Sequence, residues 1–273
     1  LEYLQREASM SQLRRPSVAG LFYPDDPDQL RSQVCAYIDA AGVTPDDAPV
    51  PKALIAPHAG YVYSGPIAGS AYARLSGSAN RINRVVLLGP AHRLPFRGLA
   101  FSLADRFETP LGEVAVDHAA LGAINDLPQV RQLDAAFDGE HCLEVQLPFL
   151  QVLLTDFRLV PLLVGTANGA EVAEVLERLW GGPETLIVIS SDLSHYLDYA
   201  TARETDRRTA EAICSLQADA IGGDQACGRI PIAGLLQQAL RHHLQASLLD
   251  LRNSGDTAGP RDRVVGYGAY AFS

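Results

Sequence analysis

The chain has 273 residues, of which 47% are hydrophobic, so it can bury the core of one large α/β domain or of two small ones. Its 22 basic and 32 acidic residues give a formal net charge of −10, and it has no basic stripe, which argues against a nucleic-acid partner. It also lacks an apolar run of about 18 residues and a signal peptide, so we expect a cytoplasmic protein without membrane contact.

The beginning of the chain and its cysteines lead to two further expectations. The only methionine is Met10, and we expect residues 1–14 to be a flexible extension and residues 15–273 to form the domain. The four cysteines show no Cys-x-x-Cys spacing, which disfavours a structural zinc finger and a thioredoxin-like dithiol. We therefore expect free thiols in a reducing compartment.

The first half of the chain alternates between patterns typical of strands and of helices. Pro and Gly residues favour an extended segment over 15–24, and the Asp-Pro-Asp cluster that begins at Asp26 can cap the helix after it. We predict helices over 26–41, 65–75 and 119–125, strands over 52–57, 84–89 and 97–104, a turn over 107–112 and an edge strand over 113–117.

The second half continues the alternation and ends in two strands separated by a polar loop. We predict helices over 140–154, 170–180, 201–220 and 230–243, and strands over 159–164, 186–190, 246–252 and 264–272. No linker requires a second domain, and hairpin-like pieces argue against a wholly parallel sheet. The sequence therefore predicts a single three-layer α/β/α domain with a mixed central sheet.

Three histidines follow three of the predicted strands. His58 and His92 each come just past a proline at the end of an apolar run, and His195 follows the run 185–191. One such histidine is more often a hydrogen-bonded structural residue, but three in equivalent places indicate a shared site. Because ligands bind beyond the carboxyl ends of strands in open α/β sheets, and imidazole is the commonest metal ligand, we expect a metal or proton-transfer site there.

A metal would need an anionic ligand in addition to imidazoles, and several side chains compete for that place. Cys227 lies in a bend before a helix, where backbone N–H groups and the nearby Arg229 would favour its thiolate. From the residues alone, an inert buried cysteine is an equally good interpretation. The full set of candidates is Asp192, Glu140, Glu144, Cys142 and Cys227.

The other histidines and cysteines have plainer interpretations. His118 falls in the first turn of a predicted helix and is expected to be exposed, and His242 and His243 are expected on the surface of the helix over 230–243. Cys35 and Cys214 are expected to be structural.

Several ordered motifs together resemble those of the Memo-like family, whose bacterial members are called AmmeMemoRadiSam system protein B. The resemblance covers nearly the whole chain after residue 14, and its specificity lies in the order of the motifs. Two positions differ from the expected pattern, since Ala91 and Cys142 stand where a serine is usual. The motifs lie at 18–24, 56–65, 88–92, 109–112, 140–148, 190–195 and 227–229.

The resemblance implies a fold similar to that of class III extradiol dioxygenases, with a pocket at the strand ends. It implies a metal bound by His58, His92 and Cys227, where the dioxygenases use a carboxylate in place of the cysteine. Fe(II) is the expected metal, with copper or zinc as alternatives, since a thiolate shifts a site toward these ions.

The same resemblance assigns roles to residues around the metal. His195 falls at the position of the general acid/base histidine, and Asp192 and His141 would line the pocket as further catalytic groups. The side chains expected to contact substrate are Tyr61, Tyr63, Glu140 and Arg229.

Three functions remain open at this point. The first is a non-haem iron or copper oxidoreductase that acts on a small molecule. The second is a metal- or peptide-binding protein without turnover, which acts with a radical-SAM partner. The third is a zinc hydrolase, in which two histidines and a cysteine leave a position open for water.

Overall fold

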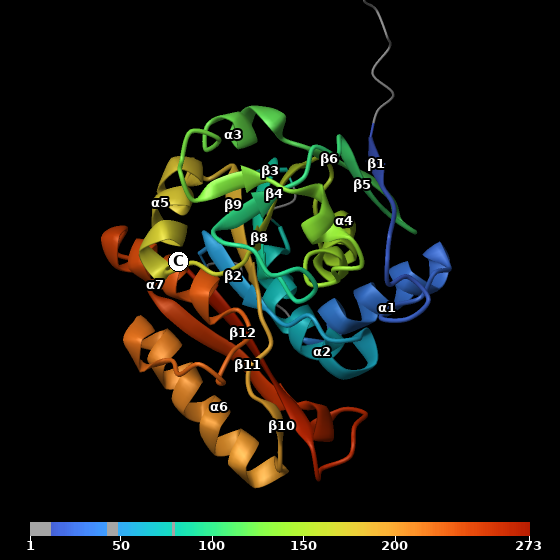
Figure 1. Ribbon diagram of the computed structural model, residues 1–273. Coiled ribbons are helices and arrows are strands. Elements are labelled where there is room, and N and C mark those ends of the chain that lie inside the picture. The colour runs from blue at the N-terminus through green and yellow to red at the C-terminus, as the bar shows by residue number, and fades with distance from the viewer. Residues whose placement is uncertain (1–11, 43–48, 78–79) are drawn as a thin grey trace, which may run out of the picture.

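The computed structural model describes residues 12–42, 49–77 and 80–273 (Figure 1). Most of the expected N-terminal extension, residues 1–11, lies outside the described residues. Its last two residues form the short strand β1 (Leu13–Arg14), which pairs in parallel with β5 (Arg106–Thr109). These two residues are therefore part of the sheet.

The described residues form an alternation of helices and strands close to the predicted one. The helices are α1 (Pro27–Ala40), α2 (Tyr61–Tyr72), α3 (His118–Gly122), α4 (Leu147–Leu153), α5 (Gly169–Leu179), α6 (Tyr199–Cys214) and α7 (Arg229–Arg241). The other strands are β2 (Ala53–Ala56), β3 (Arg84–Pro90), β4 (Leu99–Phe101), β6 (Gly112–Val116), β7 (Val130–Gln132), β8 (Arg158–Val164), β9 (Thr185–Ser190), β10 (His195–Leu197), β11 (Ala246–Asn253) and β12 (Val264–Phe272).

The strands form one mixed sheet in the order β1-β5-β6-β8-β3-β9-β2-β12-β10, with β11 paired to β12 and β4 to β7 and β8. Its centre, β6-β8-β3-β9-β2, is parallel, whereas β12 runs antiparallel to β2, β10 and β11. The mixed sheet confirms the predicted fold class. The residues of β2 and β9 are fully buried, as expected for strands covered by helices on both faces.

Helices cover the two faces of the sheet and complete three layers. Helices α1, α2 and α4 pack together on one side, and α5 and α7 pack together on the other, where α7 contacts β3 and β9 (Figure 1). Helix α6 packs against the β11–β12 pair. In the part of the chain that the structure describes, no helix is both long and apolar enough to cross a membrane.

Two helix starts show how local sequence sets the element boundaries. Asp26 caps α1 as predicted, because its carboxylate accepts a hydrogen bond from Gln29 N at 2.9 Å and Pro27 occupies the first turn. Asn168 and Glu171 form a reciprocal capping box at the start of α5, with hydrogen bonds of 2.8 and 2.9 Å.

The prediction of one helix over 140–154 was wrong. Residues before Glu144 form a turn, a single 3-10 turn covers Glu144–Gln146, and α4 begins only at Leu147. Pro148 explains the late start, because a proline lacks the N–H for an interior helical bond and is accommodated in the first turn. Residues 140–143 are therefore not part of a helix, and they lie beside the strand ends.

Several other predicted boundaries also need correction. Residues 106–109 form strand β5, so only Pro110 and Leu111 make the turn that was predicted over 107–112. The strand expected over 97–104 is confined to β4, the helix expected over 201–220 ends at Cys214, and α2 begins at Tyr61 rather than 65. The short strands β1, β7 and β10 were not predicted, because two or three residues carry too little periodicity to be recognised.

Candidate metal centre

The centre of the candidate site lies where three neighbouring parallel strands end. Strand β9 pairs with β2 on one side and with β3 on the other, so the carboxyl ends of all three meet at one edge of the sheet. His58 follows β2 by two residues, His92 follows β3 by two residues, and Asp192 follows β9 by two residues. The sheet thus brings His58 and His92 together as the strand pattern predicted, and His195, the third histidine of that prediction, lines the same cleft.

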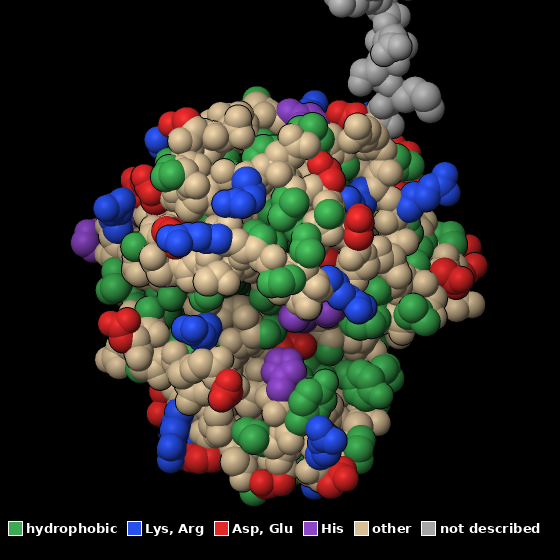
Figure 2. Space-filling view, viewed as in Figure 1, with side chains coloured by type: hydrophobic (Ala, Val, Ile, Leu, Met, Phe, Trp, Pro, Cys, Tyr) green, Lys and Arg blue, Asp and Glu red, His purple; other side chains and the backbone are tan. Residues whose placement is uncertain are grey.

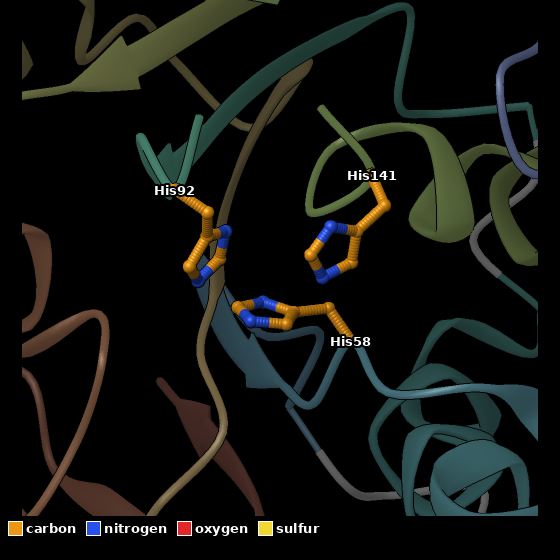
Figure 3. A group of neighbouring side chains, drawn as sticks. All are labelled: His58, His92 and His141. Carbon is orange, nitrogen blue, oxygen red and sulfur yellow. The ribbon is translucent and has the colours of Figure 1, made fainter. Parts of the chain in front are cut away.

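Three imidazole rings surround one common space (Figure 3). One ligand nitrogen from each of His58, His92 and His141 lies within 4.8 Å of the others. The ring centroid of His58 lies 5.2 Å from that of His92 and 5.4 Å from that of His141. The rings of His92 and His141 stack, with their centroids 4.9 Å apart. His141 comes from the turn before α4 and not from a strand end. The periodic pattern therefore could not identify it as part of this group.

The tautomer of His58 is fixed by a serine at the end of β9. His58 Nδ1 lies 2.9 Å from Ser190 Oγ. Ser190 donates its only hydroxyl proton to the Cys142 carbonyl at 2.6 Å, so its oxygen accepts from the ring. The Nδ1 of His58 therefore carries the proton, and Nε2 keeps the lone pair that a metal would use.

A buried carboxylate orients His92 in the same way. Glu140 accepts from His92 Nδ1 at 2.9 Å, and because a carboxylate only accepts, Nδ1 carries a proton and Nε2 is the ring nitrogen available to a metal ion. Glu140 Oε1 also accepts from the backbone N–H of His141 at 2.9 Å and lies 3.4 Å from its Nδ1. One carboxylate thus holds two of the three imidazoles.

Burial keeps two of these rings neutral. The pKa of His58 falls to about 3, chiefly because burial disfavours the imidazolium and secondly because His92 is close. The pKa of His141 falls to about 4, again chiefly because burial disfavours the imidazolium and secondly because His58 is close. Imidazoles that are neutral near pH 7 are in the protonation state that metal binding requires.

Cys227 lies beside His58, with its sulfur 3.3 Å from His58 Nε2. The turn that carries it is held against the end of β9, because Gly228 N donates to Ser191 Oγ at 2.9 Å and a Cβ at Gly228 would lie 2.6 Å from the Ser191 Cβ. The sulfur also accepts from the backbone N–H of Asp192 at 3.3 Å. In the described part of the chain, Cys227 is outside the groups whose three ligand atoms all lie within 4.8 Å.

The expectation that Cys227 is a thiolate needs correction. Burial raises its pKa to about 12, and the nearby Asp192 carboxyl acts in the same direction. These effects outweigh the helix start and Arg229, which is exposed at the first position of α7. Cys227 is therefore a neutral thiol in the protein without a metal ion.

Asp192 and His195 lie at the floor and wall of the same site. Asp192 accepts the backbone N–H of His58 at 2.7 Å, its second oxygen lies 4.0 Å from His58 Nε2, and burial raises its pKa. His195 Nδ1 donates to the Leu193 carbonyl at 2.8 Å, because a carbonyl only accepts. Its Nε2 is therefore the nitrogen that can accept a proton from a molecule in the cleft.

The remaining anionic candidates have structural partners. Glu144 accepts hydrogen bonds from Ser17 N, Val18 N and the Tyr23 hydroxyl at 2.7, 3.0 and 2.7 Å, so it holds the N-terminal segment against the domain. Cys142 is fully buried and donates from its sulfur to the Pro90 carbonyl at 3.2 Å, although it also forms a compact group with His92 and Glu140. Burial raises the pKa of Cys142 well above its ordinary value.

A cleft of about 660 Å³ opens above these residues. Figure 2 shows histidine side chains in a hollow on this face, with hydrophobic side chains beside it and basic side chains above and below. Its lining includes His58, His92, His141, Asp192 and His195. This volume suits a small organic molecule.

Of the four residues expected to contact substrate, Tyr63 lines the cleft. Tyr61 is buried, donates to the Val145 carbonyl at 2.7 Å and packs on Phe149, so it belongs to the core. Glu140 acts on the histidine rings, and neither it nor Arg229 is part of the cleft lining.

The cleft also contains residues that were not predicted. Phe22, Arg93, Tyr196 and Arg263 line it together with the final strand. Arg93 and Tyr196 directly follow His92 and His195, and Arg263 ends the polar loop before β12, so their positions beside site residues or at a loop end were the available signal.

The peripheral histidines and cysteines lie elsewhere. His118 is exposed and pairs with Asp105 at 3.1 Å, as its place in a first helical turn predicted. His242 is half-buried, because its ring stacks on Trp180 with centroids 4.1 Å apart. All four cysteines are free thiols.

The donor set fits a transition-metal ion. One ring nitrogen from each of His58, His92 and His141 lies within 4.8 Å of the others, and a thiol lies beside His58. Imidazole and sulfur ligands suit iron, copper and zinc, whereas magnesium and calcium prefer oxygen.

The chain is similar to known proteins along nearly its whole length. The model of the Memo-like protein family matches residues 14–271. A MEMO1 family protein of Aquifex aeolicus is 34% identical over 93% of this chain and 97% of its own length. A MEMO1 family protein of Archaeoglobus fulgidus is 35% identical over 95% of this chain and 99% of its own length. The chain therefore belongs to the Memo-like protein family.

Proposed function

We propose that the protein is a metal-dependent oxidoreductase that binds one iron ion with His58, His92 and Cys227 and acts on a small molecule in the cleft. The observation that carries the proposal is the 3.3 Å separation of Cys227 Sγ from His58 Nε2, the nitrogen that Ser190 leaves unprotonated. The bound ion would supply a redox-active Lewis acid at the floor of the cleft.

The sulfur environment supports Cys227 as the third ligand. The backbone N–H of Asp192 donates to the sulfur at 3.3 Å, so one donor is in place for a negative charge. A thiolate also offsets the charge of the ion better than a neutral imidazole. His141, whose nitrogen lies within 4.8 Å of those of His58 and His92, is the competing third ligand.

The chain's own residues can manage protons and substrate around the ion. His195 holds its Nδ1–H on the Leu193 carbonyl, so its Nε2 can accept a proton from a substrate hydroxyl and return it later. Asp192 holds the His58 backbone, and Tyr63 provides part of the apolar wall against which a substrate ring can pack.

Anaerobic purification followed by elemental analysis tests the metal assignment. We expect about one iron per chain in the parent protein and less than about a tenth of that in His58→Ala and Cys227→Ala. His118→Ala is the matched control, since this histidine pairs with Asp105 and lies outside the cleft lining. Equal metal content in the parent and in both variants would refute the ligand set.

Proton release distinguishes the two candidates for the third metal ligand, Cys227 and His141. Because the Cys227 thiol is protonated before metal binding, its ligation releases about one proton per ion near pH 7.5, whereas His141 releases none. Calorimetric titration in two buffers of different ionisation enthalpy counts these protons. We expect Cys227→Ser to abolish the release and His141→Gln to retain it, and the opposite result would make His141 the ligand.

Metal reconstitution separates the reaction classes. Activity restored by ferrous iron and not by zinc supports an oxidoreductase, whereas recovery with zinc alone would indicate a hydrolase. Stoichiometric metal binding without turnover of the substrates offered would favour a binding protein.

A further inference from the structure

The cleft mouth carries a feature that the metal centre does not explain. Tyr196, the residue after His195, has a backbone φ of 61°, a left-handed conformation that is unfavourable for a bulky side chain. The pairing of β10 with β12 is irregular at this point, because His195 pairs with Val265 and Leu197 with Val264. Bulges of this kind redirect side chains next to functional sites.

The bulge leaves the Tyr196 side chain in the cleft wall and in the solvent. Tyr196 is 64% exposed, lines the cleft, and has its ring centroid 5.8 Å from that of His195. A tyrosine that is this exposed contributes little to the core, so packing alone does not account for a strained backbone. The strain is consistent with a role in the cleft.

Arg263 packs over the same ring. Its guanidinium carbon lies 5.0 Å from the Tyr196 ring centroid, and Arg263 precedes Val264, the residue that pairs with Leu197 across the bulge. A guanidinium that rests on an aromatic face keeps the N–H groups at its edge available for an anion. Within the described residues, Arg263 has no carboxylate partner.

The exposed charged side chains at the mouth of the cleft are positive. Arg93 and Arg263 are the exposed charged residues in the lining, and the one carboxylate there, Asp192, is buried on the floor and accepts the His58 N–H. The Arg93 Nε donates to the Gly139 carbonyl at 3.2 Å, and its terminal N–H groups have no hydrogen-bond partner among the residues that the structure describes. This cationic mouth contrasts with the net charge of −10 of the whole chain and favours an anionic ligand.

We propose that Tyr196 and Arg263 form a subsite that binds a planar organic carboxylate, with the carboxylate on the Arg263 guanidinium and the planar part against the Tyr196 ring. The inference names the substrate class of the proposed oxidoreductase and rests on that function for its catalytic meaning. The binding itself requires no metal ion. A carboxylate held at the mouth directs the rest of the molecule toward His195 and the histidine cluster.

Binding of benzoate and of its neutral analogue benzamide to the full chain tests the subsite. Titrations followed by ligand-observed NMR are made on the protein as purified and after treatment with a chelator, since a carboxylate could also bind a metal ion. We expect benzoate to bind in both forms and benzamide to bind at least about tenfold more weakly.

Three variants assign the binding to this subsite. Arg263→Gln should weaken benzoate binding by about tenfold or more and leave benzamide unchanged. Tyr196→Asn should weaken both, because it removes the ring while asparagine tolerates the left-handed backbone. The matched control is Arg261→Gln, because Arg261 also rests on a tyrosine ring, 4.4 Å from that of Tyr199, but lies outside the cleft lining.

Each result has a defined meaning. Equal affinity for benzoate and benzamide, equal effects of Arg261→Gln and Arg263→Gln, or no benzoate binding at about 10 mM would overturn the proposal. Binding that depends on Arg263 in a protein with no metal affinity would refute the proposed function and leave the subsite standing. Metal binding without Arg263-dependent benzoate binding would refute the subsite and leave the proposed function standing.

Discussion

Glu140 accepts two hydrogen bonds from His92, one from its backbone N–H at 2.6 Å and one from its ring Nδ1 at 2.9 Å. Burial alone would raise the pKa of this carboxyl, but the hydrogen bonds from His92 and from the Cys142 backbone N–H help to lower it to about 2. The carboxylate is therefore ionised at neutral pH, and it sets both the position and the tautomer of the ring. Carboxylates in this role increase the basicity of a metal-binding imidazole.

We expect Glu140→Gln to lower metal affinity by about 10- to 100-fold, because an amide cannot accept from both His92 donors as a carboxylate does. Competition with a metal chelator of known affinity measures the change. Glu144→Gln is the control, since Glu144 is equally buried but holds the N-terminal segment. It should lower the unfolding free energy and leave metal affinity unchanged. A similar loss of affinity in both variants would show that Glu140 acts only on stability.

Asp206 gives a pH-dependent contribution to stability with a defined sign. Its carboxyl is 2% exposed on α6 and accepts the backbone N–H of Ser194 at 3.0 Å, and burial raises its pKa to about 6. The folded state then binds the proton more tightly than the unfolded state does. The stabilisation is complete below the ordinary pKa of 3.8 and is lost as the pH rises through about 6.

Asp206→Asn should therefore gain stability relative to the parent between about pH 4.5 and pH 7.5, by at most about 3 kcal/mol. Urea unfolding at the two pH values measures the difference. Asp198→Asn is a control of opposite sign on the same helix, because hydrogen bonds from Thr201 lower the pKa of the exposed Asp198. A difference between Asp206→Asn and the parent that stays constant with pH would contradict the assignment.

Gly266 allows strand β12 to pass close to the same carboxylate. A Cβ at this position would lie 1.9 Å from Asp206 Oδ2, and the Gly266 backbone exchanges hydrogen bonds of 2.8 Å with Leu193 N and Ser194 O. We expect Gly266→Ala to destabilise the protein by about 1–3 kcal/mol, as measured by chemical denaturation. The clash would displace the segment that carries Asp192 and His195.

Gly122 provides the matched control for this substitution. A Cβ at Gly122 meets no atom within 4 Å, and the residue lies in α3, so Gly122→Ala should be neutral or stabilising by up to about 1 kcal/mol. Adding Asp206→Ala to Gly266→Ala should restore part of the loss, because the two side chains occupy the same space. Strict additivity of the two changes would argue against a direct clash.

The family resemblance and the strand pattern came from local features of the sequence. The runs 52–57 and 84–89 identify buried strands, and their ends predict where His58 and His92 lie, because parallel strands end at the same edge. The prediction of a helix over 140–154 was wrong because it followed the apolar pattern and did not take into account that Pro148 is accommodated in the first turn of a helix. As a result, the position of His141 beside the other rings was not expected from periodicity.

The sequence by itself determined the three-layer fold, the family resemblance, and the convergence of His58, His92 and His195, since the order of the motifs and the ends of the strands can be recognised locally. Only the tertiary structure decided that His141 joins the ring cluster, that Cys227 is protonated, and that Tyr196 and Arg263 meet at the cleft mouth. Burial and contacts between groups far apart in the chain, such as Cys227 and His58, which are 169 positions apart, decide these properties. Such effects exist only after the chain has folded.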